Sequence, residues 1–422
     1  MTIEALPEKT DVAIAGGGMV GLSLALLLAR ACPELSILVL EAHPLPGTDS
    51  GEFAFPPSFD ARSTALSPSS RALFEQLSLW PSLEAAAAAI ETIQVSDRGR
   101  PGATRLHAAE EGFPALGYVI ENRCLGHILL QAVREYPNIR LLAPARVDHL
   151  RPGARGMGLV VGEDCCRASL AVIADGARSP LLSRLGIETE VTDYGQTALI
   201  ANVALARPHD GIAYERFTER GPMALLPLPP VDTQSRAALV WTLPPEEAAR
   251  LQGLPDQDFL PILSEHFGAR AGQFQRSGER VLYPLALAVA REQVRHHLVV
   301  AGNAAHFLHP VAGQGFNLAL RDIAVLAEVL ISEHGRRGLG DLSLLERYQA
   351  RQRGDQRRTI LFSDALPRIF AARDWPTVAA RNAGLIAMDL LPGLRGEFAR
   401  FGAGLVTPGP RPNTFVSDSE GR

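Results

Sequence analysis

A glycine-rich turn near the start of the chain has the spacing of a dinucleotide-binding site. It lies between a short β-branched apolar run at 11–15 and an apolar run of helical length at 20–30, so it joins a predicted strand to a predicted helix. In a G-x-G-x-x-G motif the first glycine allows the tight turn, the second lets a pyrophosphate approach, and the third allows close packing of helix on strand. The residues expected to hold the pyrophosphate are Gly16, Gly18, Met19, Val20 and Gly21.

A carboxylate stands where this turn needs a partner for a ribose. Glu41, followed by Ala42, lies 20 residues after Gly21, at the end of a second strand-like run at 37–40. Its carboxylate can accept hydrogen bonds from the 2′- and 3′-hydroxyls of an adenosine ribose, and it would repel a 2′-phosphate. We therefore expect FAD or NAD rather than NADP. The alternative is a structural glycine turn with an unrelated glutamate.

A second glycine turn occurs late in the chain. A predicted strand at 298–301 leads into a turn of small residues with one amide, followed by a proline, two spaced glycines and a helix from about 316 to 330. Backbone N–H groups at this helix N-terminus can hold an anion or the electron-rich edge of a reduced ring. One ligand can thus be held at both of its ends. The residues of this turn are Gly302, Asn303, Pro310, Gly313, Gln314, Gly315, Phe316 and Asn317.

These motifs occur in the order of a known family. The G-x-G-x-x-G turn, then Asp175-Gly176, then the second turn together resemble the FAD-dependent aromatic hydroxylases of the para-hydroxybenzoate hydroxylase fold, over most of the chain. Further blocks resemble the ubiquinone-biosynthesis hydroxylases, above all the branch of 2-polyprenyl-6-methoxyphenol hydroxylases. Those blocks are Asp60–Leu66, Val95–Gly99, Glu215–Thr218 with Gly221-Pro222, Tyr283–Leu287 and Gly313–Asn317.

The resemblance implies roles for several residues. Arg62 would lie near the pyrophosphate or the flavin, and either Asn122 or Arg123 would contact FAD. Asp175 and Gly176 would serve FAD and the encounter with NAD(P)H. The second turn, from Pro310 to Asn317, would line the isoalloxazine ring.

One position departs from the family pattern. Asn303 follows Gly302 where the family usually has Gly-Asp. An amide oxygen can still accept a hydrogen bond from a ribityl hydroxyl, but it brings no negative charge. The polyprenyl-phenol branch tolerates asparagine here, so the departure agrees with that branch.

The resemblance also implies the architecture, an α/β fold. We expect a Rossmann-type FAD-binding domain, an inserted β-sheet substrate domain and a C-terminal helical region. The expected FAD-binding parts are 1–80, 106–190 and 281–340, the substrate-domain parts are 81–105 and 191–280, the C-terminal helices span 341–406, and 407–422 is a disordered tail.

The implied activity is that of a flavin monooxygenase in ubiquinone biosynthesis. It would hydroxylate a polyprenylated phenol, 2-polyprenyl-6-methoxyphenol, to the 1,4-benzoquinol, using NAD(P)H and O2 through a flavin C4a-hydroperoxide. The enzyme would work in the cytoplasm beside the inner membrane, with a multiprotein assembly at the membrane surface and a homo-oligomer both left open. The alternatives are hydroxylation at another ring position, a hydroxylase of a small soluble aromatic acid, an oxidase or dehydrogenase, and a non-catalytic FAD protein.

Composition excludes other classes. The 422 residues are 46% hydrophobic and 21% charged, as in folded globular proteins, and the net charge of −5 gives no global attraction for nucleic acid. Four cysteines without a C-x-x-C favour neither a zinc site nor a disulfide framework, which suits a reducing compartment. No secretory signal or run of about 18 uncharged apolar residues is present, so we expect neither secretion nor a membrane span.

Catalytic candidates are fewer, namely Pro310, Phe217 and His306. His306 and His309 have H-x-x-H spacing, but no carboxylate completes a metal site, so a proton relay or ordinary packing is favoured over a metal. Phe217 lies in a strand-like run in which polar and aromatic residues alternate with apolar ones. These polar and aromatic members, together with Trp241, either face a substrate pocket or belong to a half-buried strand that binds no ligand. Those members are Tyr214, Arg216 and Phe217.

Two further segments have simple interpretations. The alanine run at 85–89 is predicted to be helical. The apolar segment 382–394 either packs on the core or docks on a membrane or a partner.

Overall fold

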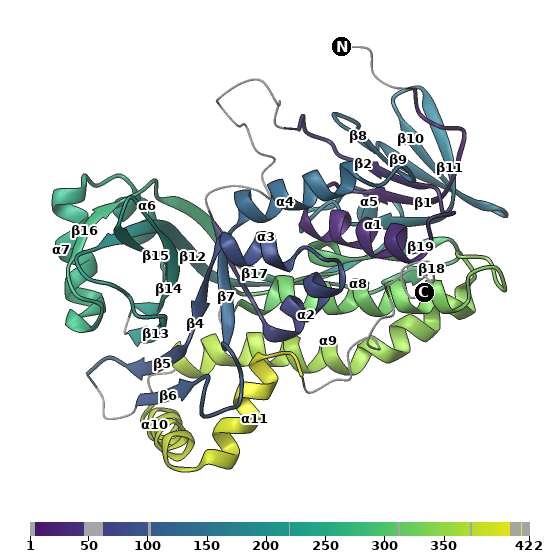
Figure 1. The fold of residues 1–422 in the computed structure, drawn as a ribbon. Coiled ribbons are helices and arrows are strands. Elements are labelled where there is room, and N and C mark those ends of the chain that lie inside the picture. The colour runs from purple at the N-terminus through teal and green to yellow at the C-terminus, as the bar shows by residue number, and fades with distance from the viewer. Residues whose placement is uncertain are drawn as a thin grey trace.

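Two large β-sheets lie side by side, with a long C-terminal helix running below both (Figure 1). The computed structural model describes residues 5–45, 62–99, 103–218, 220–310, 313–371, 374–405 and 415. Of the motif residues, Asp60, Ala61, Val311 and Ala312 lie outside these ranges.

The first sheet is mainly parallel. Its order is β18-β19-β11-β1-β2-β8, and an antiparallel hairpin of β9 and β10 extends it from β11. Parallel sheets are covered on both faces, which explains the continuous apolar runs in the sequence. Along the first strand, Val12 and Ile14 face one hydrophobic core and Ala13 and Ala15 face another. The strands are β1 (Lys9–Ala15), β2 (Ile37–Leu40), β8 (Ile139–Leu142), β9 (His149–Gly153), β10 (Gly156–Val161), β11 (Asp164–Ile173), β18 (Val294–Arg295) and β19 (Leu298–Val300).

Helices cover one face of this sheet around the first of these cores. α1 packs against both α4 and α8, whereas the short α5 lies beside β9 and contributes Leu181 and Leu182 to the second core. The helices are α1 (Met19–Ala31), α4 (Asn122–Arg134), α5 (Pro180–Arg184) and α8 (Gln314–Ser332).

The second sheet is mostly antiparallel. Its order is β20-β17-β12-β15-β14-β13-β5-β6, with β16 beside β12. The strands are β5 (Thr92–Asp97), β6 (Ala103–His107), β12 (Thr189–Leu205), β13 (Ile212–Thr218), β14 (Gly221–Val231), β15 (Gln234–Leu243), β16 (Phe274–Ser277), β17 (Val281–Ala290) and β20 (His306–Phe307). β17 pairs with β12 over most of its length, so the sheet continues past the domain boundary predicted after residue 280. That division of the chain stays a prediction.

Two helices cover the outer face of the second sheet, α6 (Pro245–Gln252) and α7 (Asp256–Phe267). Met223, Leu225 and Trp241 point outward into a core with Phe259 and Leu263 of α7. Successive residues of a strand alternate between faces, so the residues between these point inward.

A small third sheet corrects one expectation. β7 (Gly117–Glu121) pairs with β3 (Ser63–Leu66) and β4 (Ala87–Ile90). Along the chain, α2 (Pro68–Gln76) and α3 (Trp80–Ala85) connect β3 to β4. The alanines at 87–89, predicted to be helical, are therefore a strand. Pairing with the fully buried β7 outweighs the weak intrinsic preference of alanine for helix.

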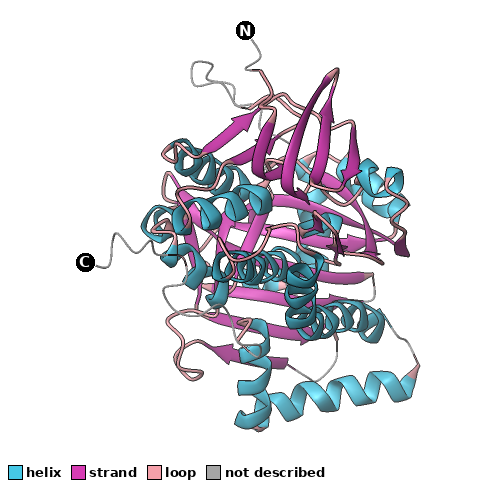
Figure 2. Cartoon of the chain, turned by 90° about the vertical axis from the view of Figure 1, so that its right-hand side faces the viewer, coloured by secondary structure: helices cyan, strands magenta, loops and turns pink. Residues whose placement is uncertain are grey.

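Three helices follow at the C-terminal end of the chain, and the last two of them form the lower end of the molecule (Figure 2). The three helices are α9 (Leu342–Ala371), α10 (Trp375–Leu390) and α11 (Pro392–Gly402). In the segment 382–394, Leu385 packs against Val95 and Phe217, which supports packing on the core. Leu390 remains 70% exposed, which leaves docking on a membrane or a partner as the other interpretation. Among the described helices, none is long and apolar enough to cross a membrane.

The predicted disordered tail lies outside the described residues except for Phe415. That side chain is fully buried in the core that contains Val12 and Ile14, so the prediction is wrong for this residue.

Candidate functional site

The first glycine turn joins β1 to α1 under tight steric limits. Gly16 has a φ of +116°, and a Cβ added there would overlap the carbonyl of Ala174. A Cβ at Gly21 would overlap the carbonyl of Gly16. Gly18 is the N-cap of α1 without a side-chain cap, and Leu22 donates to its carbonyl at 3.0 Å. The N–H groups of the first turn of α1 are thus available to an anion, which fits a pyrophosphate.

Glu41 closes this end of the site. Its carboxylate is buried at the end of β2, where Oε2 accepts a hydrogen bond from the Gly17 N–H at 2.8 Å. Oε1 accepts from the His43 N–H at 2.9 Å. An ionised carboxylate has about four acceptor positions, so capacity remains for a ribose hydroxyl. Ala42 beside it is exposed.

The second glycine turn lies directly against the first. Gly302 begins the short 3-10 helix Gly302–Ala304 with a φ of +63°, and a Cβ there would be 3.2 Å from Cγ1 of Val20 in α1. Residues nearly 300 positions apart thus share one site, as expected if one ligand bridges both turns. Asn303 next to it is exposed.

The N-terminus of α8 also fits a ligand. Gly313 caps it in the left-handed conformation, with φ +59°, and no side chain caps the first N–H groups. Gly315 and Phe316 keep some exposed surface, whereas Gln314 is buried. Pro310, which precedes the turn, is half-buried.

Asn317 acts on the turn itself. Its Nδ2 donates to the carbonyls of Ala65 and Gly313, each at 2.8 Å. Its Oδ1 accepts from the Ser67 N–H at 2.8 Å and from Oγ of Ser70 at 2.7 Å. These hydrogen bonds use the whole amide, so Asn317 holds α8 and β3 together, and its place beside a flavin stays a prediction.

His306 points away from the turn into the protein interior. Its Nε2 lies 2.5 Å from Oδ2 of Asp322 on α8, and both side chains are fully buried. Gln352 and Gln356 of α9 donate to the same carboxylate at 2.7 Å and 2.9 Å. This network links the turn to two helices. A catalytic role for His306 stays a prediction.

Sequence reasoning missed Asp322, Gln352 and Gln356. The available signal was a charged residue inside the apolar helix 314–332, since an isolated carboxylate there must be paired or exposed.

His309 is also buried. Burial lowers its pKa to about 4, so the ring is neutral near pH 7. It meets Tyr194 of β12 edge-on at 5.1 Å between ring centroids, and the Tyr194 hydroxyl donates to Asp364 of α9 at 2.8 Å. Among the described residues, no cluster of His, Cys, Asp and Glu side chains could hold a metal.

Asp175 and Gly176 follow β11, next to the first turn. Protein atoms crowd the Asp175 carboxyl and raise its pKa to about 6, although it keeps accessible surface and accepts a hydrogen bond from Oγ of Ser179 at 2.8 Å. Gly176 has a φ of +101°.

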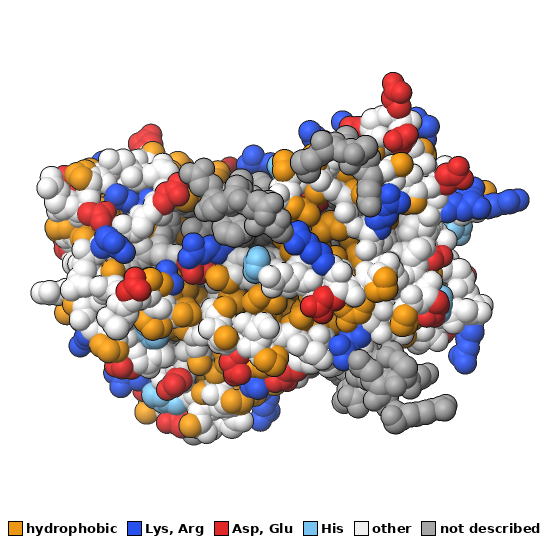
Figure 3. Space-filling model, turned by 45° about the horizontal axis from the view of Figure 1, so that its top comes forward, with side chains coloured by type: hydrophobic (Ala, Val, Ile, Leu, Met, Phe, Trp, Pro, Cys, Tyr) orange, Lys and Arg blue, Asp and Glu red, His pale blue; other side chains and the backbone are white. Residues whose placement is uncertain are grey.

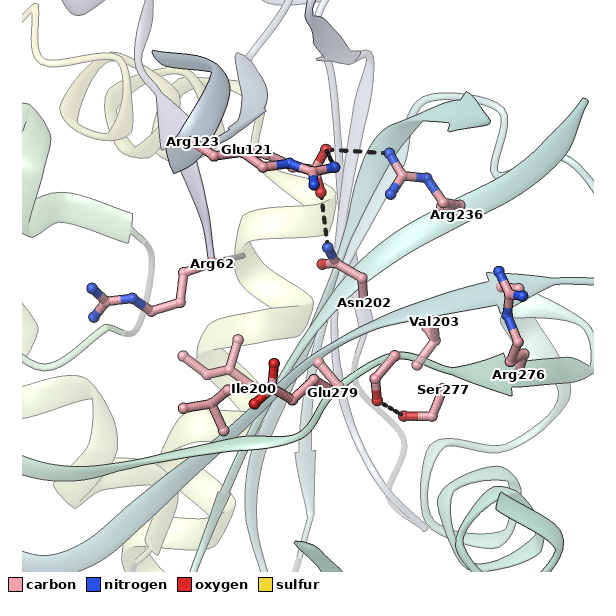
Figure 4. Close-up of a pocket in the computed structure, with 14 residues that line it drawn as sticks. Arg62, Glu121, Arg123, Ile200, Asn202, Val203, Arg236, Arg276, Ser277 and Glu279 are labelled. Atoms are coloured by element: carbon pink, nitrogen blue, oxygen red, sulfur yellow. Dashed lines mark hydrogen bonds and ion pairs between the residues drawn. The ribbon is translucent and has the colours of Figure 1, made fainter. Parts of the chain in front are cut away.

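The molecule has two lobes, a first lobe that contains the parallel sheet and α4 and a second lobe that contains the second sheet. A basic cavity of about 440 Å³ lies between them (Figure 4). Arg62, just before β3, and Arg123, on α4, line it from one side, and Arg236 and Arg276 line it from the second sheet. The guanidinium of Arg62 stacks over the ring of Tyr283 at 4.3 Å. On the same face, hydrophobic and basic side chains meet in the hollow between the lobes (Figure 3).

Glu121 joins the lobes at this cavity. Its carboxylate, 6% exposed, accepts from Nδ2 of Asn202 at 3.0 Å and from Nη2 of Arg123 at 3.1 Å, and Arg236 lies at 3.4 Å. Asn122 is buried, and its Oδ1 accepts from the Thr64 hydroxyl at 2.6 Å. Of the two alternative FAD contacts, Arg123 therefore lines the cavity and Asn122 does not.

The residues expected near a substrate divide between the two faces of β13. Tyr214 and Trp241 belong to the outer core, and Arg216 lies beside Gly268 at the end of α7. α6 and α7 cover this face, where Tyr214 lines only a small cavity of about 150 Å³, so a substrate-facing role for these three residues stays a prediction. Phe217 points inward, where it packs against Val95 and Leu385.

The comparisons with known proteins agree with this geometry. A family model described as an FAD binding domain matches residues 9–362. The chain is 36% identical over 408 residues to the ubiquinone hydroxylase UbiL of Rhodospirillum rubrum, covering 96% of this chain and 92% of that protein. It is 31% identical over 396 residues to the 3-demethoxyubiquinol 3-hydroxylase of Escherichia coli, covering 91% and 98%.

The fold has solved counterparts. The p-nitrophenol 4-monooxygenase PnpA of Pseudomonas putida matches with a TM-score of 0.75 and 18% identity, covering 96% of this chain and 100% of that one. This likeness confirms the predicted fold, in which an α/β FAD-binding domain carries a β-sheet domain and C-terminal helices.

Proposed function

Since this chain belongs to the FAD binding domain family and is an FAD-dependent monooxygenase, we propose that its substrate is a polyprenylated phenol of ubiquinone biosynthesis. The proposed reaction converts 2-polyprenyl-6-methoxyphenol to the 1,4-benzoquinol. One atom of O2 enters the ring, the other leaves as water, and NAD(P)H supplies the two electrons. The likeness to ubiquinone hydroxylases over nearly the whole chain carries this proposal.

Bound FAD would supply the activation of O2 by electrons taken from NAD(P)H. The protein would bind and orient the cofactor through the helix N-termini that begin at Met19 and Gln314. Glu41 would hold the adenosine ribose, and Arg62 would lie near the pyrophosphate or flavin. Asn303 would accept a ribityl hydroxyl without adding charge.

The inner face of the second sheet favours a neutral phenol over a small aromatic acid. A carboxylated substrate needs a cation beside its ring, and on β13 Arg216 is directed to the outer face. The arginines that the second sheet does present, Arg236 and Arg276, line the basic cavity at the other end of this face. A lipid-tailed phenol would reach the enzyme at a membrane surface or from a lipid-carrying protein. The exposed side chains of Leu390, Leu391 and Leu394 at the α10–α11 junction are suited to such a contact.

The test is a product analysis. The purified protein, loaded with FAD, is given NAD(P)H, O2 and either 2-prenyl-6-methoxyphenol or 4-hydroxybenzoate. We expect one added oxygen only on the prenylated phenol, para to its hydroxyl by NMR. Oxygen added only to 4-hydroxybenzoate would overturn the substrate class. Addition at another carbon would overturn only the assigned step.

A further inference from the structure

One row of residues runs straight across the inner face of the second sheet. The strand pairing places its members opposite one another on six neighbouring strands, β5, β13, β14, β15, β12 and β17. In that order they are Val95, Glu215, Ala224, Val240, Ile200 and Val281. Glu215 is the only polar member of the row.

This row is open, whereas its neighbour is filled. All its members except Val95 keep part of their surface exposed. Two residues further along the strands, the parallel row that contains Phe217, Thr242 and Ala198 is buried, with exposed fractions of 5%, 2% and 0%. The outer face below is closed by α6 and α7. The open row is therefore surface that a ligand can cover.

The open row begins at the cavity between the lobes and passes near the second glycine turn. Ile200 and Val281 line that cavity. Glu215 is three strands away from Ile200, about 14 Å at the usual strand spacing. Beside it on β13, Ala213 packs in the cluster that includes Ala65, and a Cβ at Gly313 would be 3.3 Å from Cβ of Ala65.

Glu215 has no ion-pair or hydrogen-bond partner for its side chain among the described residues. On β14 every residue is non-ionisable. On β5 Asp97 is paired with Arg381 of α10 at 2.7 Å, and Arg216 points to the outer face. Two further acids lie on the helices that pack against this part of the sheet, and both are engaged elsewhere. Asp389 of α10 accepts from the backbone of β6, and Asp364 of α9 is paired with Arg368.

Although the residue keeps part of its surface exposed, protein atoms crowd the carboxyl of Glu215, and this desolvation raises its pKa to about 8. Near pH 7 the carboxyl group therefore carries its proton, and it can donate one hydrogen bond and accept another. A neutral acid on an apolar surface is a matched partner for the hydroxyl or ether oxygen of a phenol. A carboxylated ring would find no cation in this row.

We propose that Glu215 binds a ring oxygen of the phenolic substrate on this open row and so makes the enzyme selective for neutral phenols. This inference rests on the proposed function and names the residue that would set its substrate class.

The experiment measures binding of 2-prenyl-6-methoxyphenol to the FAD-loaded protein by the change in flavin absorbance, from pH 6.5 to 9.5. In the unmodified protein the Kd should be constant up to about pH 8 and then rise, because ionised Glu215 has no proton to donate. The phenol itself ionises only near pH 10. Glu215→Gln keeps a donor of the same shape, so its Kd should stay flat across this range. Glu215→Ala should raise the Kd at pH 7 by roughly 3- to 10-fold.

The matched control is Glu265→Gln, an exposed carboxyl on the outer helix α7. It should keep both the Kd and its rise above pH 8. FAD content and melting temperature are recorded for every variant, so that misfolding is recognised. A Kd of Glu215→Ala equal to that of the unmodified protein, or a rise above pH 8 that persists in Glu215→Gln, would overturn this inference while leaving the proposed function standing. Absence of hydroxylation in the unmodified protein would overturn the function itself.

Discussion

The two glycine turns of the FAD site are built by opposite means. The first turn is shaped by backbone sterics, because Gly16 and Gly21 leave no room for a Cβ against neighbouring carbonyls. The second turn is shaped by buried side chains, with Asn317 holding α8 to β3 and Asp322 holding His306 to α9. The first turn is thus set locally, and the second depends on helices far along the chain. Substitutions can separate these two dependences.

The largest expected effect is that of Asp322→Asn. It replaces one of the two acceptor oxygens that serve His306, Gln352 and Gln356 with a donor, and each buried polar group left unsatisfied costs about 1 to 3 kcal/mol. We expect a lower free energy of unfolding and loss of FAD, measured by chemical denaturation and by the flavin absorbance of the purified protein.

The control for this variant is Glu333→Gln at the other end of α8, where a surface ion pair with Arg347 is lost and little should change. Full FAD content in Asp322→Asn would show that the second turn does not need α9.

Gly16→Ala should act on the first turn alone. Gly162→Ala is its matched control, because Gly162 also has a positive φ, +60°, but open space around it. Overpacking against Ala174 should cost roughly 1 to 3 kcal/mol more than the control. FAD binding should be lost in Gly16→Ala only. Equal FAD affinity in both variants would mean that the turn relaxes, and the steric account would fail.

The pH dependence of stability is a smaller effect that belongs to the second turn. The pKa of His309 is lowered from 6.5 to about 4, so the unfolded chain binds more protons than the folded one between these values. His309 therefore lowers stability as pH falls from 6.5 towards 4, by up to about 3 kcal/mol. In His309→Gln the midpoint of urea unfolding should fall less over this range. The exposed His127→Gln should behave like the unmodified protein, and identical slopes in all three would remove His309 as a cause.

The smallest expected effect is that of Asn303→Asp. Asn303 is exposed and shapes neither turn, so the melting temperature should not move. A carboxylate accepts a stronger hydrogen bond than an amide, so FAD should bind more tightly, by less than about tenfold. Fluorescence titration of the apoprotein with FAD measures this. A weaker affinity for FAD would place the ribityl chain away from Asn303.

The same contrast between the two turns explains which parts of the candidate site could be predicted from the sequence. The first turn, Glu41 and the second turn were predictable, because each is a short motif between recognisable elements. The network of Asp322 with Gln352 and Gln356 was not, because its partners lie 30 and 34 residues away on another helix. Local spacing does not report such packing.

Face assignment was the other obstacle. The alternation of Tyr214, Arg216 and Phe217 shows that a strand has two faces, but it does not say which face helices will cover. Only the positions of α6 and α7 decide that. The prediction of a helix at 85–89 failed for a similar reason. The strand at 87–90 forms because it pairs with β7, which is a long-range contact.

Phe415, near the end of the chain, packs in the hydrophobic core of the first lobe. This side chain fills the core between the parallel sheet and α1, hundreds of residues after the strands that surround it. That core is therefore complete only when residue 415, close to the end of the sequence, has been added. We expect a truncation that removes residues 415–422 to open this core beside α1, the helix that the first glycine turn begins.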